Sequence, residues 1–391
     1  MLLDNMKFSI STPAFVYDEK LISKSILGIA NTAHDINCHL LYSLKPLSII
    51  NILNSLSTHV DGFATSSLFE ARLAREVISS KGTVHITSPG LKPEQMDQII
   101  EICDYISFNS LSQWSRFRSI DIDIIGCGLR INPQLSFIKD NRYNPSRRAS
   151  KLGVPLDQLI SVISNGRDKP LKGITGIHFH NNCDSKDFNQ LFITVEKIDL
   201  LLGGFLEQLE WINLGGGYLF QEAESLDSFY ATVDLLRSKY NLDIFIEPGA
   251  TIVRDAGYIV SSVLDIFKSD DKPIAILDTT VNHMPEVFEY QFEPDVIGHN
   301  ERGRYRYLLA GASCLAGDIF GEYAFDEPLE IGSRVIFSGM GAYTFVKANM
   351  FNGINLPTIY SINEDGESSL VKQFNYEDFA SKCGVNKHEF V

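Results

Sequence analysis

The chain has 391 residues, which is long enough for two domains or for one large barrel with an addition. Its apolar fraction of 44% and charged fraction of 21% are typical of a globular protein. The net charge of −15 argues against nucleic acid and against an anionic membrane surface as partners. No apolar run approaches the length of a membrane span. The six cysteines are scattered without the spacing of a zinc site, so we expect free thiols in a reducing cytoplasm and no metal.

The predicted elements begin with a short strand at 13–17 and a helix that ends near residue 30. From there, short apolar runs alternate with longer helical ones. The strand-like runs are 38–45, 59–65, 84–88, 105–109, 124–131, 174–180, 211–214 and 243–247. The helix-like runs are 47–57, 67–79, 93–102, 111–119, 156–164, 186–209 and 226–240. Strands alternating with helices over roughly 220 residues predict a (β/α)8 barrel of the TIM type.

A doubly wound open sheet is the alternative fold for this alternating pattern. Such a sheet typically has a glycine-rich turn after its first strand, and Leu44-Lys45-Pro46-Leu47 is not glycine-rich. The segment 133–154 is long, polar and aperiodic, and in a barrel it would rise from the face formed by the carboxyl ends of the strands.

After about residue 256 the rhythm changes, because strands follow one another with few helices between them. These runs are 258–266, 274–278, 305–311 and 333–337. We therefore expect an α/β plus all-β architecture. The barrel would occupy 20–256, and a β-rich domain would combine 1–19 with 257–391.

Lys45 ends the first barrel strand, directly before Pro46. A lysine at a strand end is usually solvated. A buried one is costly unless its charge is removed or paired, and one chemistry that removes it is a Schiff base with an aldehyde cofactor.

The ends of the other barrel strands carry further polar or glycine residues, and strand ends in a barrel meet on the active-site face. They are Asp61, Arg130, His180, Gly216, Gly217 and Glu247. Backbone N–H groups of the glycines suit a phosphate, Glu247 suits a protonated ring nitrogen, and His180 could lie flat against that ring. Together these features indicate pyridoxal 5'-phosphate rather than a metal or a nicotinamide.

The β-rich region supplies a second set of candidates. Cys314 lies in a glycine-flanked loop that ends at Asp318, which makes it a candidate proton donor although most such thiols are structural. Tyr343 could donate to the phosphate. Asp318, His283 and Glu286 are candidates for substrate binding, and a loop packed between domains is an equally good explanation for His283 and Glu286.

With these residues in place, the chain resembles the fold-type III, alanine racemase-like pyridoxal-phosphate decarboxylases. Within that group it is most similar to the carboxynorspermidine/carboxyspermidine decarboxylases. The resemblance runs nearly end to end. Its motifs include Tyr42-Ser43-Leu44-Lys45, His178-Phe179-His180, Asn213-Leu214-Gly215-Gly216-Gly217, Glu247-Pro248-Gly249, Cys314-Leu315-Ala316-Gly317-Asp318 and Phe351-Asn352-Gly353-Ile354.

The resemblance implies that Lys45 binds the cofactor as a Schiff base, that Glu247 contacts its ring nitrogen, and that Cys314 from the second subunit of a homodimer protonates the carbanion. It implies a small amino acid substrate that bears further amines. Ala250 follows Glu247-Pro248-Gly249 where related enzymes commonly have Arg or Glu, so other substrates stay open. They are a related aminocarboxypropyl compound, diaminopimelate and ornithine.

Two other classes of protein remain as alternatives. A racemase of the same fold would usually pair the ring nitrogen with Arg, and Glu247 argues against it. An inactive, decarboxylase-like regulator would not need the intact set of Lys45, Glu247, Cys314 and Tyr343.

Overall fold

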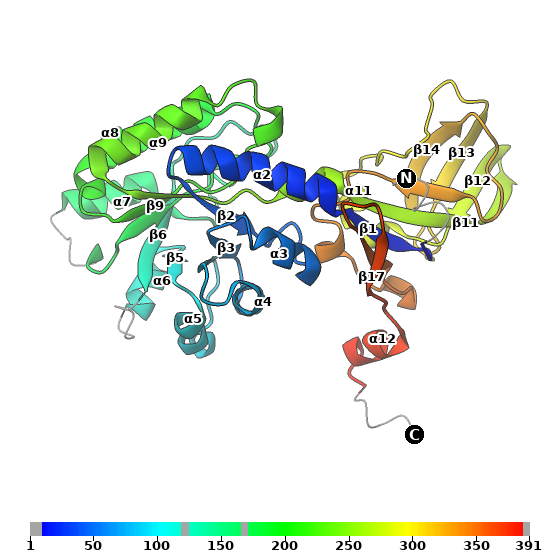
Figure 1. Ribbon diagram of the computed structural model, residues 1–391, viewed down its shortest axis with the longest axis horizontal. Coiled ribbons are helices and arrows are strands. Elements are labelled where there is room, and N and C mark those ends of the chain that lie inside the picture. Colours follow the sequence, from blue (N-terminus) through cyan, green and yellow to red (C-terminus); the bar gives the residue numbers. More distant parts are fainter. Residues whose placement is uncertain (1–9, 119–124, 166–170, 386–391) are drawn as a thin grey trace. The chain divides into compact units, whose positions relative to one another are not determined.

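A computed structural model describes residues 10–118, 125–165 and 171–385 of the chain (Figure 1). The chain divides into two compact units, one of Lys24–Thr251 and one of Met1–Ser23 with Ile252–Val391. The divisions fall within helix α2 (Glu19–Asp35) and within helix α10 (Ala250–Val253). Residues 119 and 124, where we expected a helix to end and a strand to begin, lie outside the described residues.

The first unit is a closed barrel of parallel strands, in which each strand pairs with the next and the last pairs with the first. Its strands are β2 (His39–Ser43), β3 (Gly62–Thr65), β4 (Thr83–Ser88), β5 (Tyr105–Phe108), β6 (Gly126–Asn132), β8 (Gly176–His178), β9 (Trp211–Asn213) and β10 (Asp243–Ile246). The predicted TIM-type barrel is confirmed, and the ring leaves no edge for an open sheet.

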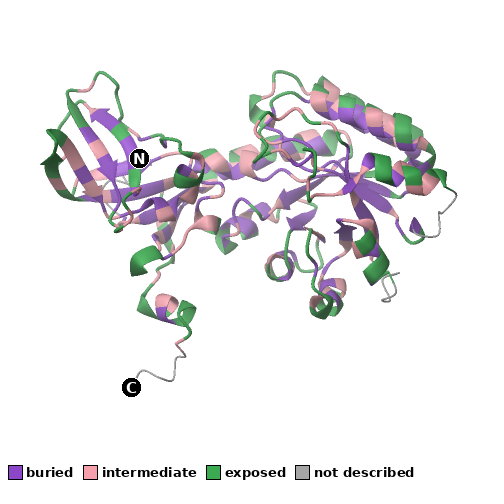
Figure 2. Cartoon of the chain, turned by 180° about the vertical axis from the view of Figure 1, so that it is seen from behind, coloured by how far each residue is buried: buried purple, intermediate pink, exposed green. Residues whose placement is uncertain are grey.

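Helices connect the strands and surround the barrel. They are α3 (Ile50–Leu56), α4 (Leu68–Ile78), α5 (Met96–Ile102), α6 (Leu111–Phe117), α7 (Leu156–Ser164), α8 (Asn189–Leu206) and α9 (Asp227–Tyr240). Two of them begin at serines whose side chains accept a backbone N–H of the first turn, Ser67 before α4 and Ser110 before α6. Figure 2 shows that the barrel strands are mostly buried while the helices around them have one buried and one exposed face.

The floor of the barrel is filled by large side chains. Leu41, Ala64, Trp211 and Phe245 form one buried cluster. A Cβ atom at Gly176 would lie 2.1 Å from the Trp211 ring, so glycine at this position leaves the space that the indole occupies. The barrel interior is therefore closed at the end where the strands begin.

The second unit is a mixed sheet in the order β14-β13-β12-β11-β1-β16-β17, and β15 pairs with β11. Its strands are β1 (Ala14–Asp18), β11 (Gly257–Ser269), β12 (Lys272–Leu277), β13 (Tyr305–Ala310), β14 (Ile319–Phe325), β15 (Arg334–Phe337), β16 (Thr358–Ile362) and β17 (Ser368–Lys372). Strand β1 lies between β11 and β16, so the first strand of the chain completes a sheet built from its last third. The predicted β-rich sheet is confirmed.

Several elements were not predicted from the sequence. Strands β14, β16 and β17 are absent from the predicted runs, as are the short helices α11 (Pro285–Tyr290) and α12 (Tyr376–Lys382). The segment 133–154 forms turns and ends in β7 (Val154–Pro155), which pairs with β6. None of the helices in the described part of the chain combines the length and the apolar character needed to cross a bilayer.

Candidate active site

Polar side chains occupy the barrel interior above its aromatic floor. Successive side chains of a strand point to opposite faces, so the residue two positions beyond a floor residue faces the interior one level higher. The residues so placed are Ser43 and Lys45 after Leu41, Arg130 after Gly128, His178 and His180 after Gly176, Asn213 after Trp211, and Glu247 after Phe245. The change from apolar to polar along each strand therefore builds a site at the carboxyl ends of the strands.

Glu247 is the acidic centre of this layer. Asn213 Nδ2 donates a hydrogen bond to Glu247 Oε1 at 2.6 Å, and Asn213 Oδ1 accepts from the Gly215 N–H at 2.8 Å. Burial raises the pKa of Glu247, while the Asn213 hydrogen bond and the charges of Arg130 and Lys45 lower it. The pKa of Glu247 is raised overall, because these partners do not fully compensate the lost solvation of its carboxylate. A further cationic N–H donor would stabilise the carboxylate.

His178 is the neighbour of Glu247 that we did not single out for a role. Its Nδ1 lies 3.2 Å from Thr87 Oγ1, and its Nε2 lies 3.7 Å from Glu247 Oε2 and is buried without a hydrogen-bond partner. Burial, followed by the charge of Arg130, holds the pKa of His178 well below its usual range, so the ring is neutral. The position of His178 inside a narrow barrel, two residues above Gly176, could have indicated this contact.

Lys45 follows β2 at the mouth of the barrel. The two residues before Lys45 bond to the strands on either side of β2. The Ser43 N–H donates to Pro248 O, after β10, at 3.1 Å, and the Leu44 N–H donates to Ala64 O of β3 at 3.0 Å. Part of its side chain reaches the surface, yet protein surrounds its amine closely enough that lost solvation, and then the charge of Arg130, lower its pKa. A lysine with a lowered pKa has a larger fraction of the neutral amine that attacks a carbonyl carbon.

Glu70 is a second acidic neighbour of Lys45 that sequence reasoning missed. It lies in the first turn of α4, where its Oε2 accepts the Ser66 N–H at 2.7 Å. Burial raises the pKa of Glu70 and the charge of Lys45 opposes that rise. The Ser-Ser-Leu-Phe-Glu segment directly after β3 carried the signal, since an acidic residue three positions after a serine N-cap is placed in the first helical turn.

The glycine-rich turn after β9 holds His180. The Gly216 N–H donates to His180 Nδ1 at 3.1 Å. A Cβ atom at Gly216 would lie 2.3 Å from Glu247 O, and one at Gly217, where φ is +91°, would lie 2.1 Å from Asn182 O. The glycines thus allow the backbones of three strand ends to approach one another.

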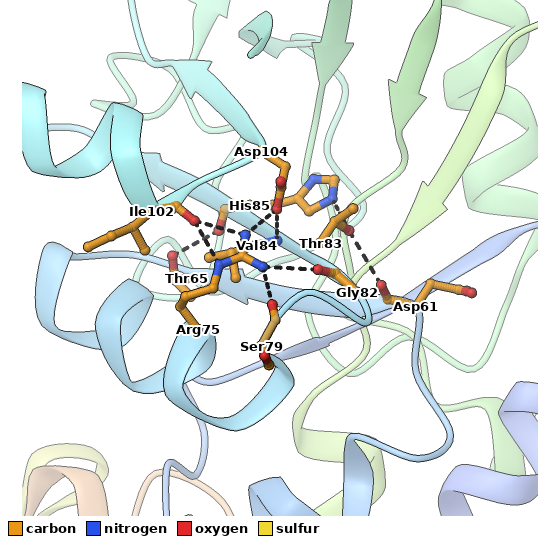
Figure 3. Close-up of polar contacts among 10 residues, drawn as sticks. All are labelled: Asp61, Thr65, Arg75, Ser79, Gly82, Thr83, Val84, His85, Ile102 and Asp104. Atoms are coloured by element: carbon orange, nitrogen blue, oxygen red, sulfur yellow. Dashed lines mark hydrogen bonds and ion pairs between the residues drawn. The ribbon is translucent and has the colours of Figure 1, made fainter. Parts of the chain in front are cut away.

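Asp61 does not lie in this layer. It precedes β3, at the amino end of the strand, where its Oδ2 accepts the Leu40 N–H at 2.7 Å. Its backbone oxygen accepts hydrogen bonds from Thr83 of β4 (Figure 3). His85, at the same end of the barrel, stacks on Tyr105 with ring centroids 4.3 Å apart. Our expectation that Asp61 binds the cofactor is therefore corrected: the apolar run 59–65 was read as one strand, but its strand begins only at Gly62.

The remaining candidates belong to the β-rich unit. Asp318 is only 3% exposed and accepts hydrogen bonds from Val281 N–H and from Ser313. His283 is fully buried, and burial lowers its pKa to about 3. Glu286 pairs with Lys347 at 3.1 Å, so its carboxylate is already engaged.

Cys314 and Tyr343 differ from those three residues in their exposure. Cys314 is exposed, and Tyr343 is half-buried. Tyr343 has a φ of +59°, a left-handed conformation that costs a residue with a side chain about 1–2 kcal/mol. Strain of this kind is concentrated at functional sites.

Comparison with known proteins places the chain in a family. Residues 14–341 match the family described as pyridoxal-dependent decarboxylase, C-terminal sheet domain. The carboxyaminopropylagmatine decarboxylase of Synechocystis is 35% identical over 390 residues, covering 98% of each chain. The carboxynorspermidine/carboxyspermidine decarboxylase of Campylobacter jejuni is 31% identical over 95% of this chain and 98% of that one.

Solved structures agree with this placement. The carboxynorspermidine decarboxylase of Campylobacter jejuni, solved in complex with norspermidine, superposes with a TM-score of 0.85 at 28% identity, covering 95% of this chain and all of that one. Diaminopimelate decarboxylase from Helicobacter pylori has the same fold, with a TM-score of 0.83 at 19% identity over 98% of this chain. The resemblance described above is thus confirmed, and the chain belongs to the pyridoxal-dependent decarboxylases.

Proposed function

We propose that the protein removes the α-carboxylate of a carboxylated polyamine of the carboxynorspermidine, carboxyspermidine or carboxyaminopropylagmatine type. The observation that carries this proposal is the near full-length similarity, at 31–35% identity, to decarboxylases that are named for these substrates. Such substrates bear amines beyond the reacting carbon, and the net charge of −15 is compatible with a cationic substrate.

The barrel residues fit pyridoxal 5'-phosphate. When bound, this cofactor accepts the electron pair of the bond that loses carbon dioxide. Lys45 would hold it through the neutral amine, Glu247 would keep a proton on its ring nitrogen, and His180 would pack against the ring. The buried, under-solvated carboxylate of Glu247 supports this fit, because a carboxylate whose pKa is raised is stabilised by a cationic N–H donor.

The other assignments follow the resemblance. Gly216, Gly217 and Tyr343 would hold the phosphate, and Arg130 would support the site through its charge next to Glu247. Cys314 would deliver the proton to the α-carbon after carbon dioxide has left. We further propose a homodimer with shared active sites. We also propose that it works in the cytoplasm, and the six free cysteines support this compartment because it keeps thiols reduced.

A carbon dioxide release assay tests the substrate proposal. The panel contains carboxynorspermidine, carboxyspermidine, carboxyaminopropylagmatine, diaminopimelate, ornithine, lysine and arginine. We expect the highest kcat/KM for one of the first three compounds. Release from diaminopimelate or ornithine alone would overturn the proposed substrate class, and no release from any compound would favour an inactive relative.

A further inference from the structure

We propose that Asn352 and Asp318 are positioning residues that fix the loop carrying Cys314. The proposal rests on the function proposed above only for the chemical role of Cys314. The anchoring itself is carried by hydrogen bonds within the β-rich unit.

Every backbone N–H from Gly311 to Leu315 has an acceptor. The Gly311 N–H donates to Asp318 O at 2.8 Å and the Ala312 N–H donates to Thr279 O at 3.0 Å. The Ser313 N–H donates to Asp318 Oδ2 at 3.0 Å, and the Leu315 N–H donates to Ser313 Oγ at 3.3 Å. The Cys314 N–H donates to Asn352 Oδ1 at 3.0 Å. A surface loop without regular secondary structure that leaves no N–H unpaired at its tip is held in one conformation.

Asp318 ties the base of the loop to a neighbouring segment. Its Oδ1 accepts the Val281 N–H at 2.7 Å, while its Oδ2 accepts the N–H and the hydroxyl of Ser313. A Cβ atom at Gly311 would lie 2.2 Å from Asp318 Oδ1, so glycine at position 311 leaves the space for this buried carboxylate. The carboxylate is consumed by these contacts, which corrects our expectation that Asp318 binds substrate.

Asn352 holds the crest of the loop from a distant part of the chain. Its backbone is left-handed, with φ of 55° and ψ of 15°, a conformation that asparagine adopts more readily than most residues. The side chain amide can therefore reach Cys314 at little conformational cost. Cys314 remains exposed while its backbone is fixed, as a proton donor that must meet one carbon atom requires.

The loss of this positioning has a defined chemical consequence. With pyridoxal phosphate bound, the proton delivered after carbon dioxide has left would either reach the α-carbon, which gives the amine, or reach the cofactor instead. In the second case hydrolysis would give an aldehyde and leave the cofactor in its amine form. A misplaced Cys314 raises the aldehyde fraction without changing the contacts that bind the substrate.

The test compares Asn352→Gly, which keeps the left-handed backbone but removes the acceptor, with Asn352→Asp, which keeps an acceptor. Asn241→Gly is the matched control, because Asn241 is left-handed at the end of α9 in the barrel unit. Ser313→Ala is a second variant that removes one anchor of the loop. Cys314→Ala sets the aldehyde fraction expected when the donor is lost.

Two measurements are made on each holoenzyme. We expect amide hydrogen exchange at residues 311–315 to be about five- to tenfold faster in Asn352→Gly, as loss of one hydrogen bond of about 1 kcal/mol predicts. We also expect the aldehyde fraction to rise towards that of Cys314→Ala with KM unchanged, and Asn352→Asp to restore both values. Asn241→Gly should match the wild type.

Unchanged exchange in both Asn352→Gly and Ser313→Ala would overturn the anchoring. Faster exchange with a wild-type product ratio would overturn positioning as its purpose. A wild-type product ratio in Cys314→Ala would instead remove the proposed role of Cys314, and hydrogen exchange would still report on the anchors.

Discussion

Lys45 and Glu247 lose solvation in the same layer of the barrel, and burial moves their pKa values in opposite directions. It lowers the pKa of the lysine and raises that of the carboxylate, so each group is pushed towards its neutral form. The attraction between the two charges opposes both shifts without reversing them. This layer therefore holds a reactive amine on one strand and, on another, a carboxylate that a cationic partner would stabilise.

Replacing Glu247 with glutamine tests whether the reaction needs the negative charge of this side chain. The variant keeps the shape of the side chain and a hydrogen-bond acceptor for Asn213, but it removes the charge. We expect kcat to fall by a factor on the order of 10² to 10³, as for loss of one preorganised group in a buried site. Since burial disfavours the carboxylate, the thermal stability of the cofactor-free protein should stay equal or rise. A variant with wild-type kcat would contradict the role of Glu247.

Much of the barrel site could be predicted from single residues. Lys45, Arg130, His180 and Glu247 end strands whose apolar pattern is clear, and the structure places all four in the upper layer of the barrel. Asp61 was misplaced because a shift in the start of β3 moves a residue from one end of the barrel to the other. His178 was not assigned a role because its signal, the glycine two residues earlier at Gly176, has a meaning only once the narrow barrel around it is known.

At the scale of elements, the close packing of the turn after β9 predicts that a side chain at Gly216 destabilises the protein. Gly216→Ala would place a Cβ 2.3 Å from Glu247 O, so β10 must shift or the turn must open. We expect a loss of stability of about 1–3 kcal/mol and weaker cofactor binding. Gly28→Ala in α2 is the control: no atom lies within 4 Å of the added Cβ, and alanine should stabilise the helix by up to about 1 kcal/mol. Equal urea midpoints for the two variants would contradict this account of the turn.

His85 in strand β4 leads to a second prediction, which concerns the dependence of stability on pH. Burial lowers the pKa of His85 to about 3, below its unfolded value of 6.5. Between pH 3 and 6.5 the unfolded chain therefore binds a proton that the folded chain does not, and stability falls as the pH falls through that window. His85→Phe should flatten this slope by about 1.4 kcal/mol per pH unit. Urea unfolding at pH 7, 6 and 5 measures it, and parallel curves for the two proteins would refute it.

Predictability at this scale followed the strength of the repeating pattern. The barrel strands were found because each stands between helices. Strand β14 was missed because glycine interrupts it (Gly321, φ +144°). Strands β16 and β17 were missed because both are short, and β17, at the edge of the sheet, has no buried residue. Their pairing depends on distant strands, which local sequence does not specify.

At the scale of the whole molecule, the resemblance implies that Lys45 and Cys314 of one active site come from different subunits. Lys45→Ala and Cys314→Ala homodimers should then each lack normal decarboxylation. When they are dissociated and mixed, half of the dimers become mixed dimers with one complete site, which predicts about a quarter of wild-type activity. Sedimentation gives the molar mass. No recovery in a mixture shown to exchange subunits would contradict shared sites.

The central claim is that Lys45 binds pyridoxal phosphate covalently. Reduction of the purified holoenzyme with borohydride, followed by peptide mapping, tests it most directly, because reduction turns a Schiff base into a stable amine. We predict that the peptide containing Lys45 gains the mass of a pyridoxyl phosphate group and that no other lysine does. Label on a different lysine, or none on a protein that is shown to contain the cofactor, would contradict the account.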